Sequence, residues 1–527
     1  MLQQPASSRP LLFNQTLLGQ GSLGQSANTS VDVRLLCACV LLLVAAIVFY
    51  SKTGRKRPGH TIPLITSLPS DKTNDSSEHL SVNLLDLLRH GYEKFKHEVF
   101  LLRPPHGDQL VIPAKYLDEL KSLPESKISL AESLSGQFLG DFTYIGKHDS
   151  TMLASIREDL ARNMETTITH LEAETRYAFE TLFDDSERWQ SAKVQPTMLR
   201  VVALLSGRVF VGLGLSRNKE FLDCIVQFTI DSFVTAEKLH RYPAYLRPLI
   251  RRWIPEYNAV QKELADMTRL LRPLVEARIH GQTGNAGENN MVDWNMKNSP
   301  AILRANVSYQ AMQQLQVSFA AIHTTTKLLT NIIFELASRP EYIQPLRTEI
   351  ETCWNSVNGT AGCSKSTLSR LHKLDSFMTE TQRHNPPGIM TFNRRMTSDM
   401  TLSNGTYLPR GTYLAAASSQ IAMDGEFWDS PERFDGFRFD RMRQEAGAER
   451  KYQFVSTGPR MLLFGYGTHA CPGRFFVSNE VKIIVSYLIM NFDMALPDGQ
   501  GRPRPITYDV AFKPDPNQEV LFRRRAR

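Results

Sequence analysis

Residues 464–475 read Phe-Gly-Tyr-Gly-Thr-His-Ala-Cys-Pro-Gly-Arg-Phe, and Cys471, the one cysteine of this run, is the most informative residue of the chain. Two glycines before the cysteine and a Pro-Gly pair after it predict a tight loop that presents a single sulfur atom. A helical pattern begins at Arg474. The sulfur is therefore expected near a helix N-terminus, where backbone N–H groups stabilise a thiolate. The alternative for a lone cysteine is a buried structural residue.

The bulk composition excludes several classes of function. The chain has 527 residues, of which 42% are hydrophobic, so it can bury one large core or two. Its net charge is +7, and the sequence contains no dense run of basic residues interleaved with aromatic residues. This argues against a nucleic-acid partner. The six cysteines lack paired spacing, so neither a disulfide framework nor a zinc site is indicated. We expect a reduced, cytosol-facing protein.

An apolar run near the N-terminus predicts a membrane anchor. Residues 35–50 contain no charge, and four basic residues follow at positions 52–57, whereas few precede the run. This asymmetry places the C-terminal body in the cytosol and favours a retained single span over a cleaved signal peptide. We predict four parts: a lumenal tail at 1–32, a transmembrane anchor at 33–51, a basic, proline-containing linker at 52–84 and a catalytic domain at 85–527.

Two sequons lie in the predicted lumenal tail, at Asn14 and Asn28. Both are candidate glycosylation sites.

The body is expected to be mainly helical with a smaller β portion, an α+β domain. Residues 85–385 contain long patterns with apolar residues every three or four positions. From Ser299-Pro300 to Ser338 no further proline and no glycine occurs, which predicts one helix of about 38 residues through the centre. Residues 391–413 and 495–523 alternate short extended runs with turns, as strands do.

Two further motifs carry chemistry. Glu380 and Arg383 are three residues apart, so a helix places them on one face, where they can form an ion pair. The run Ala320-Ala-Ile-His-Thr-Thr-Thr326 lies in the middle of the long predicted helix. Three successive threonines are poor helix formers, which predicts either a local distortion of the helix or hydroxyls bonded back to backbone carbonyls.

Together, the cysteine loop, the Glu-x-x-Arg pair and a later Pro-Glu-Arg-Phe stretch resemble the cytochrome P450 family, over about residues 85–525. The resemblance implies the cytochrome P450 fold and a bound haem b with Cys471 as the axial thiolate ligand of the iron. It implies further haem contacts from Phe464, His469, Arg394 and Gly473. It also implies a buried structural network of Glu380, Arg383 and Arg433. Arg157 is a further candidate haem contact, although the tryptophan that usually accompanies it in the family is missing.

The family usually has a glycine and an acid before a conserved threonine on the distal helix. This chain has Ala321 and His323 at those two positions, and Thr324 as the threonine. The resemblance therefore implies that Thr324 hydrogen-bonds bound dioxygen and relays protons. His323 is a candidate relay group in place of the acid, and the alternative is a satisfied core histidine.

The resemblance, which is to fungal secondary-metabolism members in particular, implies an NADPH- and O2-dependent monooxygenase of the endoplasmic reticulum membrane. Its substrate would be an apolar small molecule, terpenoid in type, and its electrons would come from NADPH–cytochrome P450 reductase. The alternatives are a haem-thiolate isomerase or dehydratase that needs no reductase, and a non-catalytic haem-binding protein. The segments implied to contact substrate are 133–143, 228–234, 319–322, 388–392 and the region of Phe512.

Overall fold

The computed structural model of the chain describes residues 62–65, 84–104, 106–147, 150–281, 289–355, 363–508 and 511–526. The predicted lumenal tail with Asn14 and Asn28, the predicted anchor at 33–51 and most of the predicted linker lie outside these residues. Among the described residues, α8 (Val194–Val211) has the length and composition to cross a membrane, but 67% of its apolar window is buried inside the protein. We describe it as a helix of the core.

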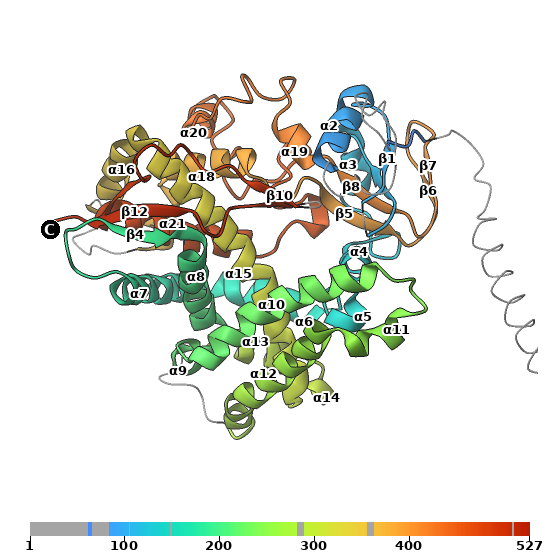
Figure 1. Ribbon diagram of the computed structural model, residues 1–527, viewed down its shortest axis with the longest axis horizontal. Coiled ribbons are helices and arrows are strands. Elements are labelled where there is room, and N and C mark those ends of the chain that lie inside the picture. The colour runs from blue at the N-terminus through green and yellow to red at the C-terminus, as the bar shows by residue number, and fades with distance from the viewer. Residues whose placement is uncertain are drawn as a thin grey trace, which may run out of the picture. The chain divides into compact units, whose positions relative to one another are not determined.

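The described domain is mainly helical, as the sequence predicts (Figure 1). Its principal helices are α2 (Leu84–Lys94), α4 (Leu130–Gln137), α6 (Ser150–Ala154), α7 (Met164–Leu182), α8, α10 (Lys219–His240), α12 (Pro255–Ile279), α13 (Met291–Asn298), α15 (Val307–Ser338), α16 (Ile343–Asn355), α18 (His372–His384) and α21 (Arg474–Asn491).

The β portion is split into small sheets. The largest has the strand order β1-β2-β8-β5-β3, and a three-stranded sheet has the order β4-β12-β9. All pairings in these two sheets are antiparallel except β2 with β8. The strands are β1 (Phe100–Leu102), β2 (Gln109–Val111), β3 (Ile128–Ser129), β4 (Gln190–Lys193), β5 (Thr391–Met396), β8 (Tyr413–Ala416), β9 (Phe492–Ala495) and β12 (Glu519–Arg524). Two hairpins complete the set: β6 (Met400–Thr401) with β7 (Tyr407–Leu408), and β10 (Ile506–Tyr508) with β11 (Ala511–Lys513).

The long helix crosses the middle of the domain, but it is shorter than predicted (Figure 1). A separate turn, α14 (Ala301–Arg304), follows Pro300, and α15 begins only at Val307 and runs for 32 residues, about 48 Å. The break arises because Asn306 caps α15: its side chain accepts a hydrogen bond from the Tyr309 backbone N–H at 3.0 Å. The prediction of a single helix from Ser299 was therefore wrong at its N-terminal end.

The threonine run does not distort α15, which stays α-helical throughout. The Thr324 and Thr326 hydroxyls donate to the carbonyls four residues earlier, at 2.9 and 2.8 Å. These bonds satisfy two of the hydroxyls without breaking the helical ladder. The Thr325 hydroxyl is buried and has no hydrogen-bond partner among the described residues. The second predicted outcome therefore holds for Thr324 and Thr326.

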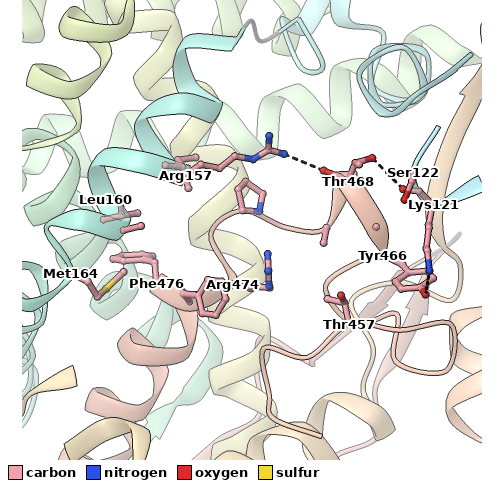
Figure 2. Close-up of a pocket in the computed structure, with 16 residues that line it drawn as sticks. Lys121, Ser122, Arg157, Leu160, Met164, Thr457, Tyr466, Thr468, Arg474 and Phe476 are labelled. Carbon is pink, nitrogen blue, oxygen red and sulfur yellow. Dashed lines mark hydrogen bonds between the residues drawn. The ribbon is translucent and has the colours of Figure 1, made fainter. Parts of the chain in front are cut away.

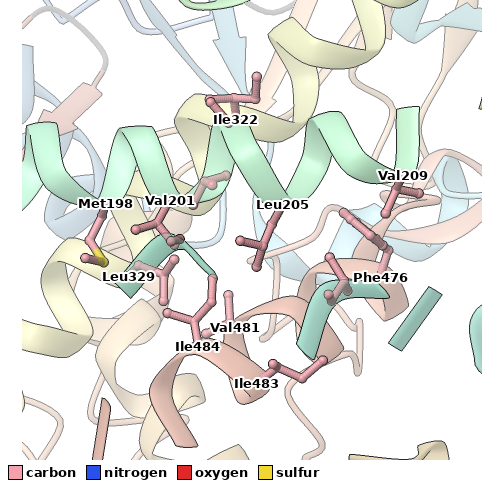
Figure 3. Close-up of a cluster of buried hydrophobic side chains, with 14 of the residues drawn as sticks. Met198, Val201, Leu205, Val209, Ile322, Leu329, Phe476, Val481, Ile483 and Ile484 are labelled. Atoms are coloured by element: carbon pink, nitrogen blue, oxygen red, sulfur yellow. The ribbon is translucent and has the colours of Figure 1, made fainter. Parts of the chain in front are cut away.

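The core holds α8, α15 and α21 together (Figure 3). Leu205 of α8, Leu329 of α15 and Ile484 of α21 are fully buried. Burial of each such side chain contributes about 1.5–3 kcal/mol. Because α21 starts three residues after Cys471, this packing also fixes the position of the cysteine loop.

Candidate active site

The cysteine loop is closed by short backbone hydrogen bonds. The Cys471 N–H donates to the Phe464 carbonyl at 2.8 Å, and the Ala470 N–H donates to the Gly467 carbonyl at 3.0 Å. Gly465 and Gly467 both adopt positive φ, of 73° and 74°, which permits the tight turn that the sequence predicts. The loop therefore holds one sulfur in a fixed place.

The Cys471 sulfur is buried at the start of α21. Burial is the largest influence and raises the pKa of the Cys471 thiol, while backbone hydrogen bonds from Gly473 and Arg474 and the positive charge of Arg474 offset part of this rise. These groups stabilise the thiolate more than the thiol. The loop thus supplies the surroundings that a metal-binding thiolate needs.

Gly467 is the most constrained glycine of the loop. A Cβ atom added there would lie 2.0 Å from the Lys121 carbonyl oxygen, so either the loop or α3 (Leu117–Leu120) would have to move. We expect Gly467→Ala to lower the free energy of unfolding by about 2–4 kcal/mol and to reduce haem content per protein. The matched control is Gly458→Ala, where an added Cβ meets nothing within 4 Å. Equal thermal unfolding of the two variants would contradict this prediction.

Cys471 and Thr324 line the same cavity, of about 400 Å³. Phe464 and Gly473 lie on its wall beside the sulfur, as the sequence predicts for haem contacts, and Ala320 and Ala321 lie beside the threonine. The rest of the wall is mostly aliphatic and aromatic. It comes from Leu130, Leu134, Met152, Leu153, Ile156, Leu160, Phe210, Met291, Val317, Leu328, Leu463, Phe476 and Val477. The polar side chains on the wall are Thr324, Thr325, Lys327, Gln382 and Asn385. A mainly apolar cavity with one thiol suits a flat apolar cofactor and a largely apolar substrate.

Two basic side chains near the loop have unused donors. Arg394 of β5 is 2% exposed, and its Nε has no hydrogen-bond partner among the described residues. His469 likewise has a buried Nε2 without a partner, and burial together with the nearby Arg394 lowers the pKa of its ring. Burial also lowers the pKa of Arg394, to about 10. The buried Arg394 guanidinium is costly unless an anion meets it, and the neutral His469 ring can donate an N–H, so this pair fits the carboxylates of a haem.

The residues present therefore fit a haem. Cys471 would supply the thiolate that binds the iron, Arg394 and His469 would hold the two propionates, and Phe464 and Gly473 would contact the ring. Haem held in this way supplies the activation of dioxygen.

Comparison with known proteins decides the family. The family model for Cytochrome P450 matches residues 150–521. The chain belongs to the cytochrome P450 family. Cytochrome P450 monooxygenase ORF5 of Penicillium roqueforti is 37% identical over 495 residues, which cover 93% of this chain and 88% of the relative. Ent-kaurene oxidase P450-4 of Gibberella fujikuroi is 33% identical over 447 residues, 84% of this chain and 87% of the relative.

A solved structure confirms the fold. Cyanobacterial CYP120A1 with bound retinoic acid superposes with a TM-score of 0.62 at 18% identity, covering 83% of this chain and 94% of that one. Together these findings make the protein a cytochrome P450 monooxygenase with a haem-thiolate cofactor, a small-molecule substrate and a redox partner.

The buried ion-pair network of this P450 differs from its prediction at one residue. Arg383 donates to both carboxylate oxygens of Glu380, each at 2.8 Å. The second arginine is Arg438, whose Nε donates to Glu380 Oε1 at 3.3 Å. The predicted Arg433 is instead exposed, and its carbonyl accepts a hydrogen bond from Arg438 at 3.0 Å. The chain turns between residues 430 and 438, which brings the later arginine inward.

His323 is not among the described residues that line the cavity. Its ring bonds to the backbone of Val226 on α10, and burial lowers its pKa. The other ring nitrogen, Nε2, is buried and has no hydrogen-bond partner in the described part of the chain. This position favours a core histidine over a relay group that touches the substrate.

Of the segments implied to contact substrate, two contribute to the cavity wall: 133–143 through Leu134, and 319–322 through Ala320 and Ala321. Residues 228–234, 388–392 and Phe512 are not on that wall. Phe233 instead stacks on Phe319 at 5.4 Å.

Three wall residues with charged or amide side chains were missed by the sequence analysis. They are Lys327, Gln382 and Asn385. Lys327 lies three residues after Thr324, so helical spacing alone could have placed it on the same side of α15.

A second pocket, of about 660 Å³, lies along the cysteine loop and carries positive charge (Figure 2). Lys121, Arg157 and Arg474 line it. Arg157 donates to the Thr468 carbonyl at 3.2 Å, so this candidate haem contact is tied to the backbone of the loop.

Proposed function

We propose that the protein is a membrane-anchored monooxygenase that uses NADPH and O2 to hydroxylate or otherwise oxidise an apolar intermediate of terpenoid type. The observation that carries the proposal is the apolar cavity with Cys471 and Thr324 on its wall. The similarity to a relative named ent-kaurene oxidase supports a terpenoid skeleton. Cys471 is assigned as the axial ligand, and Arg394 and His469 as the propionate-binding residues.

Electrons are proposed to come from NADPH–cytochrome P450 reductase. The basic pocket lined by Lys121, Arg157 and Arg474 supports this, because a cationic surface beside the cysteine loop attracts an acidic partner. The anchor at 33–51 and a lumenal tail glycosylated at Asn14 and Asn28 would hold both proteins on the endoplasmic reticulum membrane.

The deciding experiment is product analysis in microsomes that contain the full chain. Ent-kaurene and a panel of sesquiterpene and diterpene hydrocarbons are supplied with and without NADPH and the reductase. We expect oxygenated products only when both are present. Product formed without them would favour the haem-thiolate isomerase or dehydratase. A thiolate-type carbon monoxide spectrum with no turnover on any substrate would favour the non-catalytic haem protein.

Thr324 is proposed to position bound dioxygen and pass protons to it. Its hydroxyl donates to the Ala320 carbonyl at 2.9 Å, and the residue lies on the cavity wall. His323 is left out of the proposed proton path.

We expect Thr324→Ala to lower kcat roughly 10²-fold, the low end for a positioned proton donor, and to waste NADPH as hydrogen peroxide. Thr324→Ser should restore most of the coupling of NADPH to product. The matched control is Thr326→Ala, which removes a buried hydroxyl bonded to the Ile322 carbonyl on the same helix. If the two alanine variants waste NADPH equally, the role of Thr324 is not specific.

A further inference from the structure

A lysine lies inside the apolar cavity one helical turn beyond Thr324. The Lys327 Nζ donates to the Pro386 carbonyl at 2.7 Å and to the Pro387 carbonyl at 3.0 Å. An ammonium group has three donors, so one N–H remains after these two bonds. Because Lys327 is part of the cavity wall, that donor is available to a molecule in the cavity.

Within the described part of the chain, Lys327 has no carboxylate partner. Burial, and then the positive charge of Lys513 on β11, lower its pKa to about 7, and no acidic group acts in the opposite direction. The buried carboxylate of Glu335, further along α15, is already paired with Arg339 and Arg502. A buried ammonium without an anion is costly to maintain, so its presence in an otherwise apolar cavity needs a cause.

Gln382 provides a second, independent sign of a polar ligand. This α18 residue is 8% exposed and lines the same cavity, and its Oε1 has no hydrogen-bond partner among the described residues. The neighbouring Asn385, by contrast, is fully used, since it bonds to Thr381 and to Arg502. Lys327 and Gln382 thus give the cavity one polar region, where α15 meets the end of α18.

We propose that Lys327 anchors the substrate by binding a carboxylate carried on an otherwise apolar skeleton, with Gln382 as the second hydrogen-bonding group. This inference deepens the proposed monooxygenase function and rests on it. It narrows the substrate class from apolar terpenoids to terpenoid acids, and it fixes the oxidised carbon at a set distance from the carboxylate. The alternative is that Lys327 only ties α15 to the Pro386-Pro387 turn.

The test is a binding titration of the holoprotein in which the shift of the haem Soret band is the measured signal. The probes are abietic acid and lauric acid, each paired with its methyl ester, which keeps the skeleton and removes the charge. We expect each acid to bind at least 10-fold more tightly than its ester. In Lys327→Met the affinity for the acids should fall about 10–100-fold, while the affinity for the esters should change little. The matched control is Lys219→Met, since Lys219 is exposed and is not on the cavity wall.

A pH series separates the anchor from a purely structural lysine. Lys513 is the charged group that acts on Lys327, and Cys471 is the other titratable side chain among the described residues of the cavity wall. His323, four residues earlier on α15, lies off that wall, and burial lowers its pKa. As pH rises above about 7, Lys327 loses its proton and the preference for acid over ester should fall. In Lys327→Arg the preference should stay constant over the same range, because an arginine remains charged. This variant also serves if Lys327→Met fails to fold.

Two results would overturn the proposal: no preference for either acid in the wild-type protein, or an equal weakening of acids and esters in Lys327→Met. Binding needs neither NADPH nor reductase, so it is independent of turnover. A missing thiolate-type spectrum in the wild-type protein counts against the proposed function. A normal spectrum without acid preference counts against the role of Lys327 alone.

Discussion

Replacing Cys471 with alanine is expected to remove the thiolate-type carbon monoxide spectrum and to lower NADPH-dependent turnover more than 10³-fold. Among the described residues that line the cavity, Cys471 is the side chain that would bind a haem iron as an anion. Haem would supply the activation of dioxygen only while this thiolate holds the iron, so the spectrum and the reaction should fail together. Spectra of the reduced, carbon monoxide-treated protein and product analysis measure the two effects.

The matched control for this substitution is Cys224→Ser. Cys224 is buried between α10 and α12, and its Sγ bonds to the Glu263 carbonyl at 3.3 Å, a contact that a serine hydroxyl can keep. This variant should retain the shifted band. If Cys471→Ala also retained it, the axial ligand would have to be another residue, and the assignment of the site would be wrong.

The parts of the site that were predicted correctly are those fixed by local chemistry. Gly465, Gly467 and the residues around Cys471 specify a tight loop within one short stretch, so no distant contact is needed to identify it. Glu380 and Arg383 are three residues apart on one helix, and their pairing follows from helical geometry.

The errors arose where contacts come from residues far apart in the chain or where two local signals compete. Arg433 and Arg438 are both arginines of one irregular segment, and only the fold decides which of them turns toward Glu380. Both Ser299-Pro300 and Asn306 are good helix starts, and the structure uses each for a separate helix. The role of His323 likewise depends on its burial. The sequence alone does not tell which side of α15 faces the cavity.

The second large effect is expected at the buried network around Glu380. Glu380 is fully buried, and the guanidinium of Arg383 is 2% exposed. Glu380→Gln would leave Arg383 and Arg438 as buried cations with only a neutral partner. We expect a loss of about 3–5 kcal/mol in the free energy of unfolding, a large share of the stability of a typical domain. The holoprotein should then fail to accumulate.

Arg438→Ala and Arg433→Ala form a matched pair that tests the same network. Arg438 is 8% exposed and bonds to Glu380, whereas Arg433 is exposed. We expect Arg438→Ala to destabilise the protein strongly and Arg433→Ala to change the free energy of unfolding by less than about 0.5 kcal/mol. Denaturant unfolding of the two variants measures the difference. If Arg433→Ala were instead the more destabilising variant, the network of Glu380, Arg383 and Arg433 predicted from the sequence would be the correct one.

The pH dependence of stability provides an independent measure of the Glu380 contribution. Burial alone would raise the pKa of Glu380, but hydrogen bonds from Arg383 and His384 and the charge of Arg383 outweigh it and lower the pKa to about 2. A carboxylate whose pKa is depressed in the folded state stabilises the fold above its unfolded pKa, and this contribution is lost as the pH falls toward the folded value. Between pH values of about 4.5 and 2, Glu380 should therefore account for a loss of about 3 kcal/mol. Glu380→Gln removes the titrating group, so the substituted protein should lack this part of the acid transition. The comparison is made in a background that carries stabilising substitutions, so that both proteins can be purified. An identical acid transition in both proteins would show that Glu380 is not held as a carboxylate by its two arginines.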